Sequence, residues 1–115
     1  MRYLFQFGFE GPREFKSNAA GGWDDESSEA IWINAPSAEA ALAWGRSVAE
    51  QFVTRLFEMA GVEGYSWLAR DFAYWIADDE AVLDWARTSS EIPVADFGHL
   101  PDLEALAESR LRLAP

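Results

Sequence analysis

The chain has no cysteine, one lysine and one histidine among its 115 residues. The lack of cysteine excludes disulfides and thiolate chemistry, and it favours a cytoplasmic setting. With His99 as the one histidine, a zinc site built from histidine and cysteine is excluded, and a serine–histidine–aspartate relay would have to use that residue. We expect His99 to be a loop residue or a cap of the last helix.

Long apolar runs and phosphate-binding motifs are also missing. No segment approaches the ~18 apolar residues that a transmembrane helix needs. Gly21-Gly22 is followed neither by the Lys-Ser/Thr of a P-loop nor by the spacing of a dinucleotide fingerprint. The acidic clusters at 24–26 and 78–80 lack the alternate carboxylates and the glycine of a calcium loop. We therefore predict no catalytic residue, no cofactor and no metal site.

Negative charge is what the sequence has in excess. The chain has twenty acidic and nine basic residues, so its formal net charge is −11. Residues 71–108 hold ten of these carboxylates against one cation, Arg87. Because nucleic acids and anionic membranes carry the same sign, we expect neither as a partner, whereas a basic protein surface would be attracted.

The composition predicts one folded domain over residues 1–115. Half of the residues are hydrophobic and 15% are aromatic, which is ample material for a core. A chain of this length buries roughly two thirds of the surface that its unfolded form exposes. Intrinsic disorder is therefore not expected despite the net charge.

Periodicity predicts the first elements. Strict alternation over 2–9 is typical of a strand, and a second strand is expected over 29–35. Apolar residues that recur every three or four positions predict an amphipathic helix over 38–60, with Ser37 as its N-cap. Gly45 in the middle of this helix costs about 1 kcal/mol relative to alanine, so we expect close approach to a sheet or an aromatic ring there.

The second half of the chain is less regular. Residues 62–76 fit both periods, but their aromatic and branched content favours a strand, in one or two pieces. A short helix capped by Asp78 or Asp79 is expected to end at Ala86, and a short edge strand follows over 92–97. A last helix is expected from Pro101 onward.

These elements predict an α+β fold with the order β-β-α-β-α-(β)-α. The sheet is small and mostly antiparallel, with three to four strands, and it carries one long helix and two shorter ones. A ferredoxin-like arrangement is one way to draw this order. Residues 13–28 are expected to form a polar, glycine-rich loop.

The tryptophans, six in all, provide candidate contacts. Trp32 and Trp75 point away from the apolar side of their predicted strands. If one face of the sheet is uncovered, the two rings lie side by side on it and form a patch typical of a partner site; if both faces are covered, they belong to the core. The candidate partner-binding residues combine tryptophans with acidic clusters: Trp23, Asp24, Asp25, Glu26, Trp32, Trp75, Asp78, Asp79, Glu80 and Asp84.

Three classes of function stay open on this basis. The first is a small acidic, non-enzymatic interaction protein, such as an inhibitor or immunity-type protein that binds a basic protein partner. The second is a small-ligand-binding domain or an enzyme that uses carboxylates, with aromatic residues lining a cleft. The third is a subunit of a homo-oligomer, for instance a homodimer, with no chemistry of its own. We expect the first, because opposite charge would steer association.

Overall fold

The computed structural model describes residues 1–22 and 25–113, and within them it has four helices and a four-stranded sheet. The predicted α+β class is confirmed. The elements follow one another as β1 (Arg2–Phe9), α1 (Pro12–Gly21), β2 (Ser27–Asn34), α2 (Ala38–Met59), β3 (Tyr74–Ile76), α3 (Glu80–Thr88), β4 (Val94–Asp96) and α4 (Leu103–Leu113).

The sheet has the order β3-β1-β2-β4. β1 pairs antiparallel with both β2 and β3, and the short edge strand β4 pairs in parallel with the end of β2. The mostly antiparallel sheet is therefore as predicted. The ferredoxin-like arrangement stays a comparison rather than an assignment.

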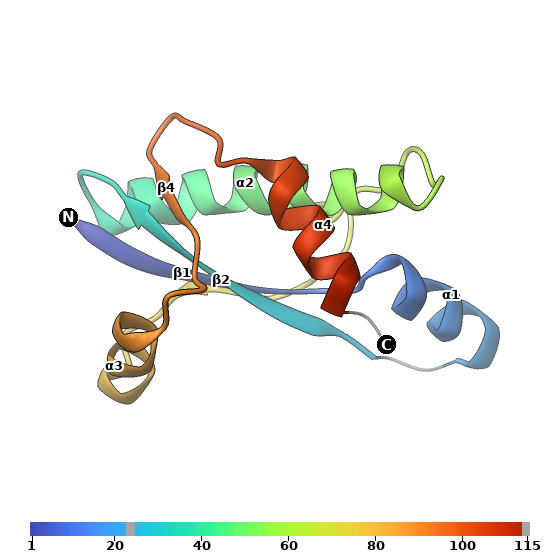
Figure 1. Cartoon of the computed structure of the whole chain (residues 1–115), viewed down its shortest axis with the longest axis horizontal. Coiled ribbons are helices and arrows are strands. Elements are labelled where there is room, and N and C mark those ends of the chain that lie inside the picture. The colour runs from blue at the N-terminus through green and yellow to red at the C-terminus, as the bar shows by residue number, and fades with distance from the viewer. Residues whose placement is uncertain (23–24, 114–115) are drawn as a thin grey trace.

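The two faces of the sheet are covered to different extents. Helices α2 and α4 lie on one side of the sheet, and α3 lies on the other side near one end (Figure 1). On the α2 side, alternate residues of β1 and β2 form the main core: Phe5, Phe7, Phe9, Ile31 and Ile33. On the α3 side, Leu4 and Trp32 pack with Ala86 in a second, smaller cluster.

The long helix α2 matches the predicted helix closely. The Ser37 side chain accepts a hydrogen bond from the backbone N–H of Ala40 at 3.1 Å, which confirms the N-cap. Gly61 follows the helix with a φ of +82°, a left-handed conformation that glycine adopts without strain. A Cβ placed on Gly45 would overlap the ring of Phe5, so the predicted close approach is confirmed.

Gly45→Ala is expected to lower the free energy of unfolding by about 1–2 kcal/mol. Alanine favours a helix interior by about 1 kcal/mol, but the fully buried Phe5 ring would have to move. Chemical denaturation would measure the change. Ser47→Ala, on the exposed side of the same helix, serves as the control and is expected to be neutral or slightly stabilising. A Gly45→Ala variant as stable as this control would contradict the packing argument.

Helix α1 replaces most of the loop predicted over 13–28. Its start has the features of a capping box, because the Glu14 carboxylate accepts from the backbone N–H of Gly11 at 2.9 Å, and Pro12 occupies the first turn. Phe15 packs edge-on against Phe57 and Tyr65, and this contact holds the helix against the end of α2. The serine- and glycine-containing sequence has low helix propensity, so this tertiary contact outweighs it.

The strand predicted over 62–76 is wrong except at its end, since β3 covers three residues. The Glu50 carboxylate of α2 accepts from the Ser66 hydroxyl at 2.7 Å and from the Trp67 backbone N–H at 2.8 Å. These bonds hold the segment in turns against α2. Tyr65 and Phe72 then pack against the main core although the segment forms neither a helix nor a long strand.

Candidate functional site

Trp32 lies beneath α3, and the expectation that it shares an open face with Trp75 is wrong. Strands β3 and β4 are the two opposite edges of the sheet, so the helix that joins them has to cross one face. That crossing leaves Trp32 only 7% exposed. Trp32 is therefore part of the core, as the covered-sheet alternative requires.

Beyond α3, no helix within residues 1–22 and 25–113 covers the same face of the sheet, and two indole rings border it. Trp75 is 43% exposed and donates from Nε1 to Gln6 Oε1 at 3.0 Å. Trp85, on α3, is 56% exposed and lines a groove together with Gln6 and Ala30. Trp75, Gln6 and Ala30 are cross-strand neighbours, so Trp75 stands at one end of this row. We call Gln6, Ser28, Ala30, Trp75 and Trp85 the open face.

The tryptophan on α3 was not among the residues selected from the sequence. Val82 and Ala86 face the sheet, and Trp85, three residues after Val82, lies at the flank of that side of the helix, so the spacing alone does not decide its exposure. What the spacing does not give is its position beside Gln6, because this depends on the direction in which α3 crosses the sheet.

Carboxylates extend from the open face along α3. The predicted acidic residues Asp78, Asp79, Glu80 and Asp84 are all exposed. Asp79 is the N-cap and accepts from the backbone N–H groups of Ala81 and Val82, so it has a structural role as well as a charge. The other three carboxylates are free of such a role and contribute mainly to the surface potential.

Arg87 offsets part of the negative charge on α3. Its Nη1 atom lies 2.9 Å from Asp84 and 3.7 Å from Glu80. These pairs are exposed, and pairs of that kind are worth about 0–1 kcal/mol. The helix and its approach therefore keep a net negative charge towards solvent.

The other acidic cluster lies at the opposite end of the open face. The Glu26 carboxylate sits over Gly8, with Oε1 3.1 Å from the position that a Cβ on Gly8 would occupy. Asp25 is exposed, and its backbone N–H and C=O are both bound by the Asn18 side chain. Trp23 and Asp24 lie outside the described residues. The structure thus brings Glu26, Trp75 and the carboxylates of α3 to one side of the molecule.

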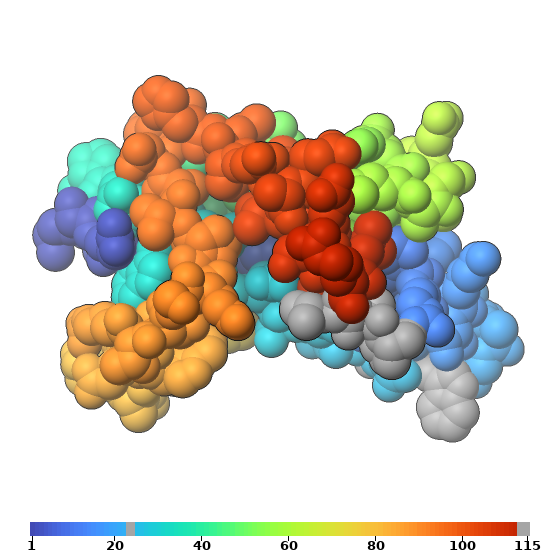
Figure 2. Space-filling view, in the orientation of Figure 1, coloured from blue at the N-terminus to red at the C-terminus, as the bar shows by residue number. Residues whose placement is uncertain are grey.

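A groove of about 580 Å³ runs over the edge of β2, between α4 and the segment that leads into β4 (Figure 2). β4 pairs with residues 32–34 of β2, and no other strand in the described part of the chain pairs with the outer edge of β2 before them. Glu29 and Arg110 form an ion pair of 3.1 Å at this groove. Burial raises the pKa of the Glu29 carboxyl, and the neighbouring Arg110 guanidinium opposes that rise.

Within the described residues, the other side chains that could bind a metal or act chemically do not come together in one place. Among residues 1–22 and 25–113 there is no group of three histidine, cysteine, aspartate or glutamate residues placed to hold a metal ion. His99 lies in the exposed loop before α4, where its backbone carbonyl accepts from Trp44 Nε1 at 3.2 Å. None of the described helices has the length and apolar character to cross a membrane.

The open face therefore has the features of a contact surface: two exposed indoles, a polar amide that binds one of them and carboxylates at both ends. Comparison with known proteins adds nothing to this description. No protein-family model, no curated protein and no solved structure matches the chain.

Proposed function

We propose that this protein is a small, acidic, non-enzymatic interaction protein that binds a basic protein partner through its open face. An inhibitor or an immunity-type protein would have this physical character. The absence of cysteine is consistent with action in the cytoplasm, which is part of the proposal. We further expect neither nucleic acid nor a membrane surface as the partner, because both carry negative charge.

The observation that carries the proposal is the pair of exposed tryptophans near Gln6: Trp75 is its cross-strand neighbour, and Trp85 lines a groove with it. Exposed tryptophans lose much water-accessible surface on binding, and tryptophan is enriched among residues that dominate interface energies. A rim of charge around an aromatic centre is the usual anatomy of a specific interface. Here the rim is acidic, so the complementary surface is basic.

The long-range contribution of the carboxylates is expected in the association rate. A net charge of −11 attracts an oppositely charged surface over about one Debye length, which is ~10 Å at 0.1 M salt. Charges at the rim of an interface mainly change the association rate and its salt dependence, whereas buried aromatic contacts change the dissociation rate. The tryptophans of the open face and the carboxylates beside it are therefore expected to have separate kinetic signatures.

We predict that the triple variant Asp78→Asn, Glu80→Gln and Asp84→Asn slows association with the partner about tenfold or more at low salt. Asp79 is left intact because its side chain caps α3. The partner is first captured from source cells on the immobilised protein, with a Trp75→Ala/Trp85→Ala variant as the subtraction. It is then purified for stopped-flow measurements across a range of ionic strengths.

The matched control neutralises three exposed carboxylates away from the open face: Glu39→Gln, Glu63→Gln and Glu108→Gln. It changes the net charge equally, so a much smaller effect on association is expected if location matters. Equal effects of the two triple variants, or an acidic captured partner, would contradict the proposal. Sizing chromatography separates the homodimer alternative, in which the open face is covered by a second copy.

A further inference from the structure

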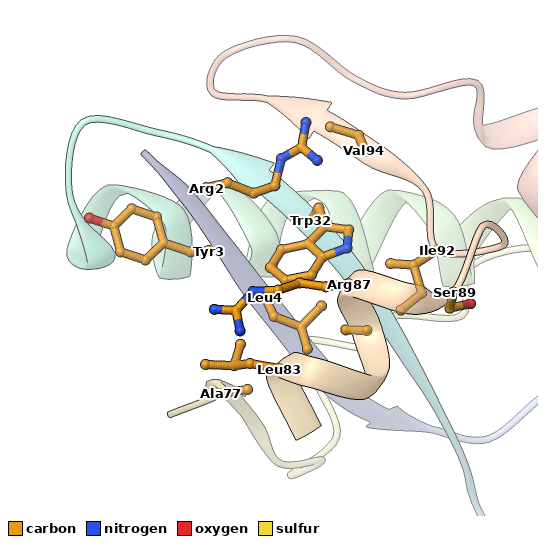
Figure 3. A pocket seen from close by; sticks show the side chains of 11 residues that line it. Arg2, Tyr3, Leu4, Trp32, Ala77, Leu83, Arg87, Ser89, Ile92 and Val94 are labelled. Atoms are coloured by element: carbon orange, nitrogen blue, oxygen red, sulfur yellow. The ribbon is translucent and has the colours of Figure 1, made fainter. Parts of the chain in front are cut away.

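We propose that the pocket between β1, β2 and α3 binds a small ligand with a flat hydrocarbon body and one carboxylate. This inference is independent of the proposed partner, because the pocket lies under α3 rather than on the open face. Its volume is about 400 Å³, within the range of small-molecule sites. We call it the Trp32 pocket, after the ring around which it is built (Figure 3).

The inner wall and sides of the Trp32 pocket are hydrocarbon, and polar side chains line the rest. Leu4, Trp32 and Ala86 belong to the small cluster beneath α3 and form its inner wall. Leu83 from α3 and Ile92 from the following loop line its sides. Trp32 is 7% exposed, so a ligand touches only a small part of its ring, and a flat apolar body suits the space between Leu83 and Ile92.

Two arginines line the same pocket, and this is the feature that selects the ligand. The chain has only nine cations against twenty carboxylates, yet Arg2 and Arg87 both reach this cavity. Figure 3 shows the Trp32 ring between their side chains, one coming from β1 and the other from α3. Guanidinium groups match the planar geometry of a carboxylate through paired N–H donors.

Neighbouring groups hold both arginines while leaving donors available. Arg2 uses Nε to donate to Asn34 Oδ1 at 3.2 Å. Arg87 uses Nη1 to contact Asp84 and Glu80. A guanidinium has five N–H donors, so each side chain has further N–H groups for a ligand in addition to the contacts that orient it.

The charges around the pocket limit the ligand to a monoanion. Asp84 and Glu80 lie beside Arg87 and reduce the positive potential that this guanidinium offers. The wider surface is strongly acidic and repels polyanions in proportion to their charge. A carboxylate on a hydrocarbon ring therefore fits better than a phosphate ester or a nucleotide.

The test compares 2-naphthoate with 2-naphthamide, which share one hydrocarbon body and differ in charge. Binding is followed by the indole N–H resonance of Trp32, assigned through a Trp32→Phe sample, in two-dimensional nitrogen–proton NMR spectra. We expect both probes to shift this resonance and the carboxylate to bind about tenfold more tightly, since hydrogen bonds to charged groups are stronger than neutral ones.

Variants then test the arginines themselves. Arg2→Gln and Arg87→Gln together are expected to remove the preference for the carboxylate while leaving the affinity for the amide unchanged. Arg13→Gln, exposed on α1 at the other end of the sheet, makes the same kind of change and should keep the preference. Both mutated side chains are exposed, and circular dichroism is used to check that each variant folds.

Three outcomes would overturn the inference. One is a Trp32 N–H resonance that does not move at up to about 10 mM probe, a concentration that detects even weak binding. Another is equal affinity for the two probes in the unmodified protein. The third is a carboxylate preference that survives in the double arginine variant. The partner-association experiment is unaffected by any of them, because it reports on the open face.

Discussion

Trp67→Ala is expected to lower the free energy of unfolding by about 3–5 kcal/mol. Trp67 is 2% exposed, and its ring packs edge-on against Phe7 with centroids 5.7 Å apart. Its Nε1 donates to the backbone carbonyl of Gly8 at 2.8 Å in a buried hydrogen bond. The truncation therefore leaves a cavity and removes the partner of a buried carbonyl, and both effects destabilise the folded state.

Denaturation with urea, followed by circular dichroism, measures this loss. Trp85→Ala is the control, because the same residue type is removed from a site that is 56% exposed. We expect that variant to change the free energy of unfolding by less than about 1 kcal/mol. If Trp67→Ala were no more damaging than Trp85→Ala, the assignment of Trp67 to the core would fail.

Glu10→Ala is expected to cost about 2–4 kcal/mol of unfolding free energy. Glu10 directly follows β1 and is 3% exposed. Its carboxylate accepts from the Tyr65 hydroxyl at 2.9 Å and from Asn18 Nδ2 at 3.1 Å, and it lies 3.0 Å from Arg70. One side chain thus ties the end of β1 to α1 and to the turns that follow α2. Arg70 is half-exposed and turns to water when released, which limits the cost.

The control for Glu10 is Glu104→Ala. Glu104 also meets an arginine through both carboxylate oxygens, at 2.8 and 3.0 Å from Arg55, but this pair lies on the surface. We expect a clearly smaller effect there, because water replaces the lost contacts. Equal losses in the two variants, measured by the same denaturation, would show that burial of Glu10 does not matter.

A second measurement separates the effect of the negative charge of Glu10 from the effect of its side-chain volume. Burial, and then the hydrogen bond and charge of Glu10, raise the pKa of the Tyr65 hydroxyl well above its ordinary value of 10.0. Glu10→Gln removes the negative charge and keeps the side-chain volume. The pKa of Tyr65 should therefore fall, while burial keeps it above the ordinary value. Ultraviolet absorbance of tyrosinate, with Tyr65→Phe as the blank, follows this change.

The parts of the fold that sequence patterns predicted are those encoded within a few turns of chain. The α2 stripe, the Ser37 cap and the Asp79 cap all depend on residues three or four positions apart. Helix α1 and the turns at 62–73 were not predicted correctly, because distant partners hold them. Phe15 packs on α2 and its following turn, and Glu50 binds the segment around Trp67.

The same distinction between local and long-range information applies to the candidate site. The acidic character of residues 78–84 was predicted, and exposure of Trp75 was one of the two alternatives; both are seen in the structure. Trp32 was selected as a partner contact but belongs to the core, and Trp85 was not selected. Both errors have one cause: the sequence does not show which part of a sheet face a connecting helix will cover.

The amino-acid sequence by itself determined the strong negative charge, the α+β class and the places where the main helices begin, because composition and short-range periodicity carry that information. Tertiary structure alone decided which tryptophans meet water and which arginines share a pocket. The reason is that α3 must cross from one edge strand to the other. Its path buries Trp32, leaves Trp75 and Trp85 exposed, and brings Arg87 to the same cavity as Arg2.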